Sequence, residues 1–498
     1  MLFKMFIPSR GMLSFRYRGT TIRTSAFKLF VIVFCTVSMV LFMRLQGLFL
    51  SMPLTEEKHL SGSKSLTIDH EHIGRYPVAR TTSNLQEPPS IRSMIDTEKS
   101  ILQNDLSFAS KTIPTPYNLP SLQLNMKEST VDVEKIRKYV QEINNRKEIR
   151  NLEKFPGSLR DNSLVIIVQV HNRPDYFSQL IRSLGRARGI QNTLLVISHD
   201  FYNEEMDKIA KAIDFCKVLQ IFFPYSMQLY PDQFPGTDPK DCPRDVTKEK
   251  AKIMKCKNAD HPDKYGHFRE AKFTMTKHHW WWKANTVFDG LNITKYYNGP
   301  VLFLEEDHYA APDFYHIMRQ LYHAKQSDAS CANGCDIMTL GTYTVPADYK
   351  EAGEEKVELV PWKSVKHNMG MAFDRNTWNR LKNCKEMFCK YDDYNWDWTL
   401  MRMSKTCLGK PLHAMVMKTP RMFHIGECGL HHKKKQCDPQ KSIARVNTII
   451  NNNERSFYPE SLILEQKHSV PSNHGQPNGG WGDTRDHALC LTYDKSAR

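Results

Sequence analysis

Short apolar runs alternate with amphipathic stretches between residues 164 and 305. The runs LVIIVQV, TLLVIS, KVLQIFF and VLFLE, which begin at Leu164, Thr193, Lys217 and Val301, have the length of buried strands. The stretches DYFSQLIRSLGRARG and NEEMDKIAKAI lie between the first three runs and have apolar residues at helical spacing. AKFTMTKHHWWWKANTVF, which precedes the fourth run, is also helix-like. Strands that alternate with helices predict βαβ units, so we expect an α/β fold with a parallel sheet.

Polar residues follow the predicted strands. HNRP comes after the first strand, and SHD, which ends at Asp200, comes after the second. The carboxyl ends of parallel strands share one edge of a sheet, where open α/β sheets bind ligands. The chain has no G-x-G-x-x-G sequence and no P-loop, which disfavours a dinucleotide enzyme and a P-loop NTPase. A nucleotide could still bind through ring stacking, an arginine and a carboxylate on its ribose.

The fourth predicted strand ends in three consecutive carboxylates, Glu305, Glu306 and Asp307. Crowded carboxylates repel one another unless a cation or a polar ligand lies among them, which favours a metal or substrate site. A solvated acidic turn is the alternative. Beside a nucleotide, these residues resemble the DxD element of nucleotide-sugar glycosyltransferases, in which a divalent cation bridges an aspartate to the diphosphate. Such a cation offsets charge on the leaving nucleotide.

The first 155 residues differ from the rest of the chain. An apolar run between Lys28 and Arg44 predicts a transmembrane signal anchor at 29–50, with a cleaved signal peptide as the alternative. Basic residues before the run and acidic ones after it orient a single-pass type II protein with a cytosolic tail at 1–28. Pro-rich residues predict a largely irregular stem at 51–155, although its last part has helical spacing. We expect a luminal catalytic domain at 156–498 and, because the span is short, the Golgi apparatus membrane.

The formal net charge of +15 does not by itself indicate a nucleic-acid partner. Seven of the lysines and arginines precede Glu56, the first acidic residue, which leaves +8 for the rest of the chain. A remainder of that size, spread over both signs of charge, is a weak argument for binding a polyanion. We therefore expect no nucleic-acid partner. A homo-oligomer is compatible with the sequence.

The cysteines fit an oxidising compartment. Apart from Cys35 in the predicted span there are eleven, so at least one is unpaired. Cys216 lies in an apolar strand-like run, and we expect it to be the buried free thiol. The other ten could form five disulfides. CGLHHKKKQC has zinc-like content, but its spacing matches no usual finger, and a Cys428 to Cys437 bridge is favoured over a zinc site. A single N-x-T sequon predicts glycosylation at Asn292.

Several longer motifs between residues 162 and 493 resemble the N-acetylglucosaminyltransferase II family. They are LEEDHYAAPDFYH, TKHHWWWK, QLYPDQFPGTDPKDCPRD, WKSVKHNMGMAF, YDDYNWDWTL, FHIGECGLHHKKK and NGGWGDTRDHALC. The resemblance implies a GT-A type glycosyltransferase fold with a Rossmann-like nucleotide-binding half. It implies an inverting enzyme with Mn²⁺ that moves N-acetylglucosamine from UDP-GlcNAc, in β-1,2 linkage, onto the α-1,6-arm mannose of N-glycans on glycoproteins. That step commits a glycan to the complex type.

The resemblance also implies roles for individual residues. Asp397 matches the catalytic base, and Asp307 and His424 match the metal ligands, a reasonable set for manganese. Four residues match the acceptor site: Glu305, Asn368, Tyr394 and Trp396. Eleven match the donor site: Gln169, Val170, His171, Asn172, Arg173, Asp200, Met275, Thr276, Lys277, His278 and His279. Met275 stands where a polar residue is expected, so only its backbone would contact the donor.

The disulfides that the resemblance implies are Cys242 with Cys256, Cys331 with Cys335, Cys384 with Cys407, Cys389 with Cys490, and Cys428 with Cys437. The sequence CANGC departs from the family, because it has one residue more between its cysteines than the expected C-x-x-C. That departure puts the conformation of this loop in doubt.

Other interpretations stay open for single residues and for the function. His424 alone is more often a core histidine, and at least one of Trp280, Trp281 and Trp282 belongs to the core. YDDYNWDW could be an aromatic packing cluster with helix-capping acids, and Asp392 and Asp393 are rival bases. A secretory-pathway glycosidase or glycan-binding protein is the alternative function, and neither needs joint binding of UDP and manganese.

Overall fold

The structure is a computed structural model that describes residues 12–17, 20–25, 132–160, 162–331, 334–427, 439–467 and 475–496. The chain divides into two compact units, residues 1–103 and 104–498. In the first unit, β1 (Met12–Tyr17) pairs antiparallel with β2 (Thr20–Ser25). The predicted anchor at 29–50 lies outside the described residues. Among the helices that are described, none is long and apolar enough to cross a membrane.

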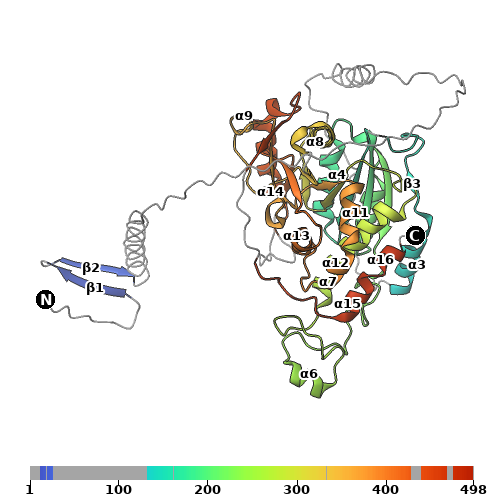
Figure 1. Ribbon diagram of the computed structural model, residues 1–498, viewed down its shortest axis with the longest axis vertical. Coiled ribbons are helices and arrows are strands. Elements are labelled where there is room, and N and C mark those ends of the chain that lie inside the picture. Colours follow the sequence, from blue (N-terminus) through green and yellow to red (C-terminus); the bar gives the residue numbers. More distant parts are fainter. Residues whose placement is uncertain are drawn as a thin grey trace, which may run out of the picture. The chain divides into compact units, whose positions relative to one another are not determined.

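The second unit is built on a ten-stranded mixed sheet, which confirms the predicted α/β class (Figure 1). The strands in order are β14 (Ile463–Gln466), β10 (Lys356–Pro361), β12 (His413–Met417), β9 (Ile337–Thr339), β11 (Met371–Phe373), β7 (Val301–Glu305), β4 (Leu164–Val170), β5 (Thr193–His199), β6 (Lys217–Phe222) and β3 (Ile149–Arg150). The four strands predicted from apolar runs, β7, β4, β5 and β6, are adjacent and parallel. The antiparallel strands β3 and β11 flank this block.

Both faces of the sheet are buried. Alternate residues of β4 enter two different cores, because successive side chains of a strand point to opposite faces. Leu164, Ile166 and Val168 pack with helices α4 (Pro174–Gly185), α5 (Glu204–Lys211) and α8 (Phe314–Ser327). Val165 and Ile167 belong to the core that contains α7 (Ala271–Asn285), α11 (Arg375–Asn383), α12 (Lys385–Lys390) and α13 (Trp396–Thr406). This burial explains why the strands are continuous apolar runs.

The folded unit begins before residue 156. Helix α3 (Val133–Arg146) starts at Asp132, whose side chain accepts a hydrogen bond from Glu134 N at 3.0 Å. Its buried face packs Ile136 and Val140 against Phe222 at the end of β6. The last part of the predicted stem therefore contains a helix, followed by β3, that packs against the sheet.

A two-stranded sheet lies beside the large one. It pairs β8 (His308–Ala310) antiparallel with β13 (Met422–His424), and helix α14 (Pro439–Asn452) packs on it. The remaining helices are α6 (Lys248–Met254), α9 (Tyr349–Ala352), α10 (Ser364–His367), α15 (Thr484–Cys490) and α16 (Tyr493–Ser496), and a π-helical turn, Thr286–Gly290, continues α7.

Four disulfides are present in the described residues. They join Cys242 to Cys256, Cys331 to Cys335, Cys384 to Cys407 and Cys389 to Cys490, which are pairs that the family resemblance implies. Cys428 and Cys437 lie outside the described residues. Cys216 is free and buried, which confirms the prediction for that thiol. All three tryptophans of the WWW sequence are also buried.

Candidate active site

The carboxyl ends of β5, β4 and β7 meet at one edge of the sheet. In the strand register Gln169 lies opposite both Ser198 and Glu305. The side chain of Gln169 also accepts a hydrogen bond from Lys283 Nζ on α7 at 2.5 Å. Burial lowers the pKa of Lys283, although the negative charges of Glu305 and Asp200 act to raise it. The predicted loops thus assemble beside a buried lysine that the sequence did not indicate.

Asp200 lies between two histidines at this edge. Its Oδ1 is 2.6 Å from His171 Nδ1, and its Oδ2 is 3.4 Å from His279 Nδ1. The other nitrogen of His279 lies 2.8 Å from Ser198 Oγ, which fixes the ring. Although burial alone would raise it, the hydrogen bond with His171 and the nearby imidazole of His279 hold the pKa of Asp200 well below its ordinary value. Asp200 is therefore an anionic acceptor at the sheet edge.

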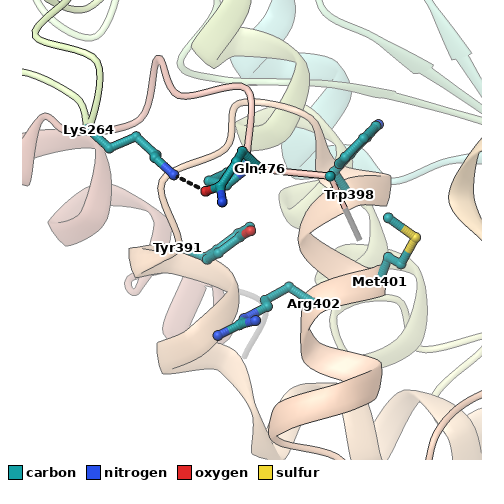
Figure 2. A pocket seen from close by; sticks show the side chains of 8 residues that line it. Lys264, Tyr391, Trp398, Met401, Arg402 and Gln476 are labelled. Atoms are coloured by element: carbon teal, nitrogen blue, oxygen red, sulfur yellow. Dashed lines mark hydrogen bonds between the residues drawn. The ribbon is translucent and has the colours of Figure 1, made fainter. Parts of the chain in front are cut away.

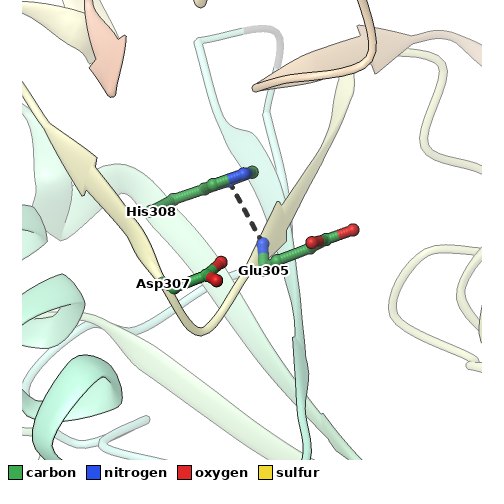
Figure 3. Close-up of side chains that lie close together, drawn as sticks. All are labelled: Glu305, Asp307 and His308. Carbon is green, nitrogen blue, oxygen red and sulfur yellow. Dashed lines mark hydrogen bonds between the residues drawn. The ribbon is translucent and has the colours of Figure 1, made fainter. Parts of the chain in front are cut away.

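A candidate metal site lies at the end of β7, which is separated from β5 by β4 (Figure 3). One ligand atom from each of Glu305, Asp307 and His308 falls within 4.8 Å of the others. Asp307 Oδ2 is 2.8 Å from Arg173 NH1 and 3.3 Å from His424 Nε2. The other carboxylate oxygen of Asp307 is buried and has no hydrogen-bond partner. A buried carboxylate oxygen without a donor, beside imidazoles, fits a divalent cation.

The strands β8 and β13 hold this site together. They place His424 opposite His308, and Ile425 N donates to the carbonyl of Asp307 at 2.9 Å. The chain then passes so close to Asp307 that a Cβ on Gly426 would lie 2.2 Å from its Oδ2. Burial alone would raise the pKa of Asp307, but His424 and Arg173 hold this pKa below its ordinary value. The pair predicted as metal ligands is thus in contact.

Glu306 has a different task from its two neighbours. Its Oε2 accepts a hydrogen bond from His171 N at 2.7 Å, and its Oε1 pairs with Arg173 Nε. Burial raises the pKa of Glu306 to about 7, although Arg173 opposes this. Glu306 therefore fixes the loop that follows β4. The sequence alone did not distinguish this role from metal binding by the neighbouring carboxylates.

Asp397 is at the second position of α13 and is half-buried. Its Oδ1 accepts from Trp398 N at 2.9 Å, and its Oδ2 accepts from Asn368 Nδ2 at 3.1 Å. Burial raises its pKa to about 6, and the negative charges of Asp393 and Glu305 contribute. A carboxyl group with a pKa near the working pH suits general-base chemistry.

The rival carboxylates have main-chain partners. Asp393 accepts from the backbone N–H groups of Asn395 and Asn478, each at 2.9 Å. Asp392 accepts from Lys264 N at 2.6 Å and from Trp481 N at 2.9 Å. Both acids thus hold the loop before α13 in place, which is a structural task.

Asn368 and Tyr343 complete the surroundings of Asp397. Asn368 is the C-terminal cap of α10, and its Oδ1 accepts from the Tyr343 hydroxyl at 3.2 Å. Partial burial, together with the charges of Glu305 and Asp397, raises the pKa of Tyr343 to about 12. The charges of Glu305 and Asp397 therefore both act on the Tyr343 hydroxyl. Tyr343 belongs to an irregular loop, and no sequence pattern singled it out.

The other residues that the resemblance assigned to the acceptor lie closer to the core. The indole of Trp396 is 7% exposed and stacks on Trp280 at a centroid distance of 4.6 Å. Tyr394 is half-buried and its ring lies 5.0 Å from that of Phe273.

The donor residues on α7 do not share one direction. Lys277 Nζ donates to the carbonyls of Tyr391 and Asp393, and His278 Nε2 lies 2.9 Å from Asp486 Oδ1. Met275 is buried in the core. The structure brings His279 to Asp200 and directs these three residues elsewhere.

Three donor residues remain. Val170 is buried in the core between β4 and α4, Thr276 is half-buried, and the side chain of Asn172 accepts from Asn203 Nδ2 at 2.8 Å.

A cavity of about 300 Å³ lies beside α13 (Figure 2). It is lined by Lys264, Tyr391, Trp398, Met401, Arg402, Gly475, Gln476 and Pro477. Trp398 is the neighbour of Asp397 in the sequence. Lys264 Nζ donates to Gln476 Oε1 at 2.5 Å across the cavity wall. The cavity thus adjoins the helix of the candidate base and combines aromatic faces with hydrogen-bonding groups.

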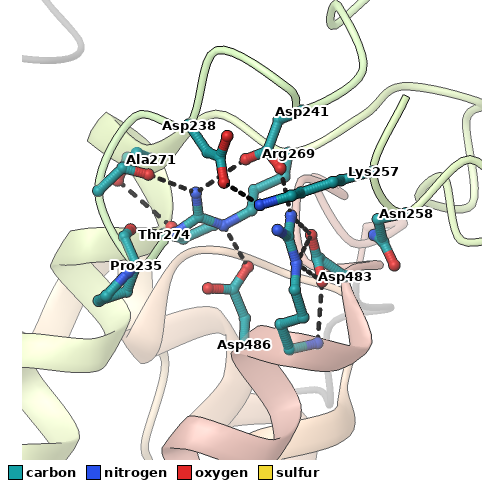
Figure 4. Close-up of polar contacts among 12 residues, drawn as sticks. Pro235, Asp238, Asp241, Lys257, Asn258, Arg269, Ala271, Thr274, Asp483 and Asp486 are labelled. Atoms are coloured by element: carbon teal, nitrogen blue, oxygen red, sulfur yellow. Dashed lines mark hydrogen bonds and ion pairs between the residues drawn. The ribbon is translucent and has the colours of Figure 1, made fainter. Parts of the chain in front are cut away.

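The segment 475–490, which we call the C-terminal clasp, fixes the loop before α13. Tyr394 N donates to Gly479 O at 3.0 Å, and Trp481 Nε1 donates to Cys389 O at 2.8 Å. Helix α15 is tied to the rest of the fold by ion pairs, shown in Figure 4. Asp486, which is buried, is 2.8 Å from Arg269 Nε, and Arg485 NH2 is 2.7 Å from Asp241 Oδ1. The position of Asp397 therefore depends on residues far along the chain.

Comparisons with known proteins identify relatives of this chain. The model of the family described as N-acetylglucosaminyltransferase II matches residues 137–490. Alpha-1,6-mannosyl-glycoprotein 2-beta-N-acetylglucosaminyltransferase of Sus scrofa is 46% identical over 357 residues, which cover 72% of this chain and 79% of that protein. The Homo sapiens protein of that name is 46% identical over 358 residues, with the same coverage of 72% and 79%. The Arabidopsis thaliana protein of that name is 36% identical over 347 residues, which cover 69% and 77%.

Proposed function

Because the chain belongs to the N-acetylglucosaminyltransferase II family, we propose that it moves N-acetylglucosamine from UDP-GlcNAc, in β-1,2 linkage, to the α-1,6-arm mannose of N-glycans. The names of its relatives state a 2-beta-N-acetylglucosaminyl transfer to an alpha-1,6-mannosyl glycoprotein. The observation that carries the proposal is one polar site with two parts. One part is the unpaired buried oxygen of Asp307, and the other is the carboxyl group of Asp397.

On the donor side, Asp307 and His424 would hold Mn²⁺. A metal bound there would neutralise charge on the diphosphate as the sugar bond breaks. Asp200, held anionic by His171 and His279, would accept hydrogen bonds from the hydroxyls of the nucleotide. Arg173, which lies beside Asp307, would bind phosphate oxygens. The parallel block of the sheet, with these groups at its carboxyl edge, supports a GT-A type fold.

On the acceptor side, Asp397 would take the proton of the mannose hydroxyl as its oxygen attacks the anomeric carbon. A base on the face opposite the leaving UDP gives inversion at that carbon. The raised pKa of Asp397 makes its carboxylate a better proton acceptor than an ordinary aspartate. Glu305, Asn368 and Tyr394 border this region and would bind the acceptor sugar.

We also propose a type II protein of the Golgi membrane with a luminal catalytic unit. The apolar run at 29–50 and the basic residues before it support this topology. Four disulfides support an oxidising compartment, since such bonds are rare in the cytosol. The exposed side chain of Asn292 is compatible with glycosylation there.

The test is an assay of the full chain with UDP-GlcNAc, Mn²⁺ and defined N-glycans, read by mass spectrometry. We expect one added N-acetylglucosamine on the α-1,6-arm mannose, in β-1,2 linkage. Asp397→Asn should lower turnover by about 10² to 10⁴, the usual contribution of a general base, while binding of UDP with manganese stays the same. Transfer to no N-glycan acceptor, or near-normal turnover of Asp397→Asn, would refute the proposal.

A further inference from the structure

We propose that Tyr343 is a positioning residue for the acceptor-side base, because its hydroxyl holds the amide of Asn368 in place against Asp397. This inference rests on the proposed function, since it assigns a role within the same site.

The three side chains form a directed chain of hydrogen bonds. The Tyr343 hydroxyl donates to Asn368 Oδ1 at 3.2 Å, and Asn368 Nδ2 donates to Asp397 Oδ2 at 3.1 Å. The second carboxylate oxygen of Asp397 accepts from Trp398 N. Each oxygen of the candidate base therefore has one fixed donor, which sets the direction of its remaining lone pairs.

An amide side chain is ambiguous without a second partner. Its oxygen and its nitrogen have similar size, and rotation by half a turn exchanges an acceptor for a donor. If Asn368 turned, its oxygen would face the carboxylate of Asp397 and the two acceptors would repel each other. The carboxylate of Asp397, which can only accept, excludes this alternative, and the Tyr343 hydroxyl then gives the amide oxygen a partner that holds the side chain in place.

The backbone around Asn368 is fixed, but that does not orient its side chain. His367 O accepts from Trp362 Nε1 at 3.1 Å and from Thr339 Oγ1 at 3.2 Å, and His367 Nδ1 accepts from Lys363 N at 3.0 Å. The hydrogen bonds described for the Asn368 side chain are those to Tyr343 and Asp397. Asp397 thus sets which end of the amide faces it, and Tyr343 holds the other end in place.

Tyr343 itself is held close to Asn368 by the chain. Leu340 N donates to Gly370 O at 3.0 Å and Gly341 N donates to Met369 O at 3.2 Å, so the loop of Tyr343 starts against the segment that follows Asn368. A Cβ on Gly341 would lie 2.8 Å from Met369 Cγ and 2.9 Å from Met422 O. Glycine at 341 therefore permits the close approach of the two segments.

Removal of the hydroxyl alone tests this role. Tyr343→Phe keeps the ring, which is 58% exposed, and removes only the donor. We expect kcat at saturating donor and acceptor to fall by about 2- to 10-fold, the usual effect of one hydrogen bond, with the KM for UDP-GlcNAc unchanged. Tyr296→Phe, at a tyrosine 82% exposed elsewhere on the surface, is the matched control and should retain full activity.

A double-mutant cycle separates positioning from any other effect of Tyr343. In the Asn368→Ala background, Tyr343→Phe should cause no further loss, because the amide through which it acts is gone. Equal losses in both backgrounds would overturn the proposal, and so would an unchanged kcat of Tyr343→Phe.

A carboxyl titration tests the same chain of contacts without substrate. ¹³C NMR of the aspartate carboxyls in the full chain, with the Asp397 signal assigned by its loss in Asp397→Asn, would follow this group against pH. Glu305 on β7 and Asp393 before α13 also act on Asp397, and both are unchanged in Tyr343→Phe. We expect the midpoint to move upward, because an unanchored Asn368 donates less to the carboxylate. An unmoved midpoint would overturn the positioning role, whereas a moved midpoint in a protein that transfers no sugar would refute only the proposed function.

Discussion

The surroundings of Asp397 raise its pKa and so make its carboxylate a stronger proton acceptor. Its carboxyl group lies partly buried near Asp393 and Glu305, so the charged form is disfavoured, and its pKa is raised to about 6. Trp398 N and Asn368 oppose this by donating to the carboxylate. The result is a group that is deprotonated at neutral pH and still holds a proton more firmly than a surface aspartate.

We expect kcat/KM for the acceptor to fall as the pH drops through about 6. Only the deprotonated carboxylate can take a proton, so activity is retained above this pKa and lost below it. The measurement is a pH profile at saturating UDP-GlcNAc and Mn²⁺. Residual activity of Asp397→Asn should lack this acid limb; the same limb in the variant would assign it to another group.

Asp307 shows the opposite adjustment, since His424 and Arg173 hold its pKa low. Its position after an apolar strand was evident in the sequence, where a metal or substrate site and a solvated acidic turn were both open interpretations. The contact with His424 was not evident, because that residue comes from a three-residue strand far along the chain. Only the family resemblance connected the two.

Asp307→Asn and His424→Ala should each weaken manganese-dependent UDP binding by at least about 10-fold, because each removes a ligand. Calorimetry with UDP in the presence and absence of Mn²⁺ measures this. Asp348→Asn is a matched control, since Asp348 is the exposed N-cap of α9 and asparagine caps a helix equally well. Normal UDP affinity in both variants would remove these residues from the metal site.

In helix α7, neighbouring residues of one sequence motif have different structural partners. Successive helical residues are rotated by about 100°, so neighbours in the sequence face different parts of the molecule. His279 reaches Asp200, His278 reaches Asp486, and Lys277 reaches the carbonyls before α13. A motif carried over as a block from a family therefore mixes residues that face the donor with residues that hold the fold.

His279→Ala and His278→Ala should have different effects. His279→Ala should weaken UDP binding, because it removes a partner of Asp200 at the sheet edge, and the loss of its buried ring should lower stability as well. His278→Ala should leave UDP binding unchanged. His278→Ala should lower the free energy of unfolding by about 1 to 3 kcal/mol, because a buried oxygen of Asp486 loses its partner. Thermal denaturation and UDP titration of both variants distinguish the two roles, and identical behaviour would contradict them.

The sequence predicts some strands and helices of the fold better than others. The strands β4, β5, β6 and β7 were predictable because a sheet covered on both faces requires continuous apolar runs. Strands β8 and β13 were not, because three residues show no period. The helix α3 was visible in its spacing, but its packing on β6 was not, since the pairing of Ile136 and Val140 with Phe222 is a tertiary contact.

The C-terminal clasp links the end of the chain to α12 and to the loop before α13. The clasp meets the loop before Asp397 through Gly479, and the Cys389 to Cys490 bond ties α12 to α15. These contacts join residues that are far apart in sequence, so no local pattern predicted them. The family resemblance implied the Cys389 to Cys490 pair, whereas the other contacts of the motif NGGWGDTRDHALC follow only from the folded chain.

Replacement of Cys389 and Cys490 by serine should lower the free energy of unfolding by about 2 to 4 kcal/mol, because the bond closes a long loop of the unfolded chain. Turnover should fall with it, since the loop that carries the base loses an anchor. The matched control replaces Cys331 and Cys335, which are only 4 residues apart, and should be milder. Denaturant unfolding and the transfer assay measure both; equal stability of the first variant and the parent would contradict the anchor.

The clasp also sets an order of events during biosynthesis. A ribosome adds about 5 to 20 residues per second, so Cys490 is made about 5 to 20 seconds after Cys389, from which it is separated by 101 positions. During that interval Cys389 lacks its native partner and lies close to Cys384 in the sequence, while Cys407, 23 positions from Cys384, is made well before Cys490. The shorter bond can form first, and pairing of Cys389 with Cys384 or Cys407 would compete with it. The candidate base is therefore fixed in position only after the strands that would hold the nucleotide have been synthesised.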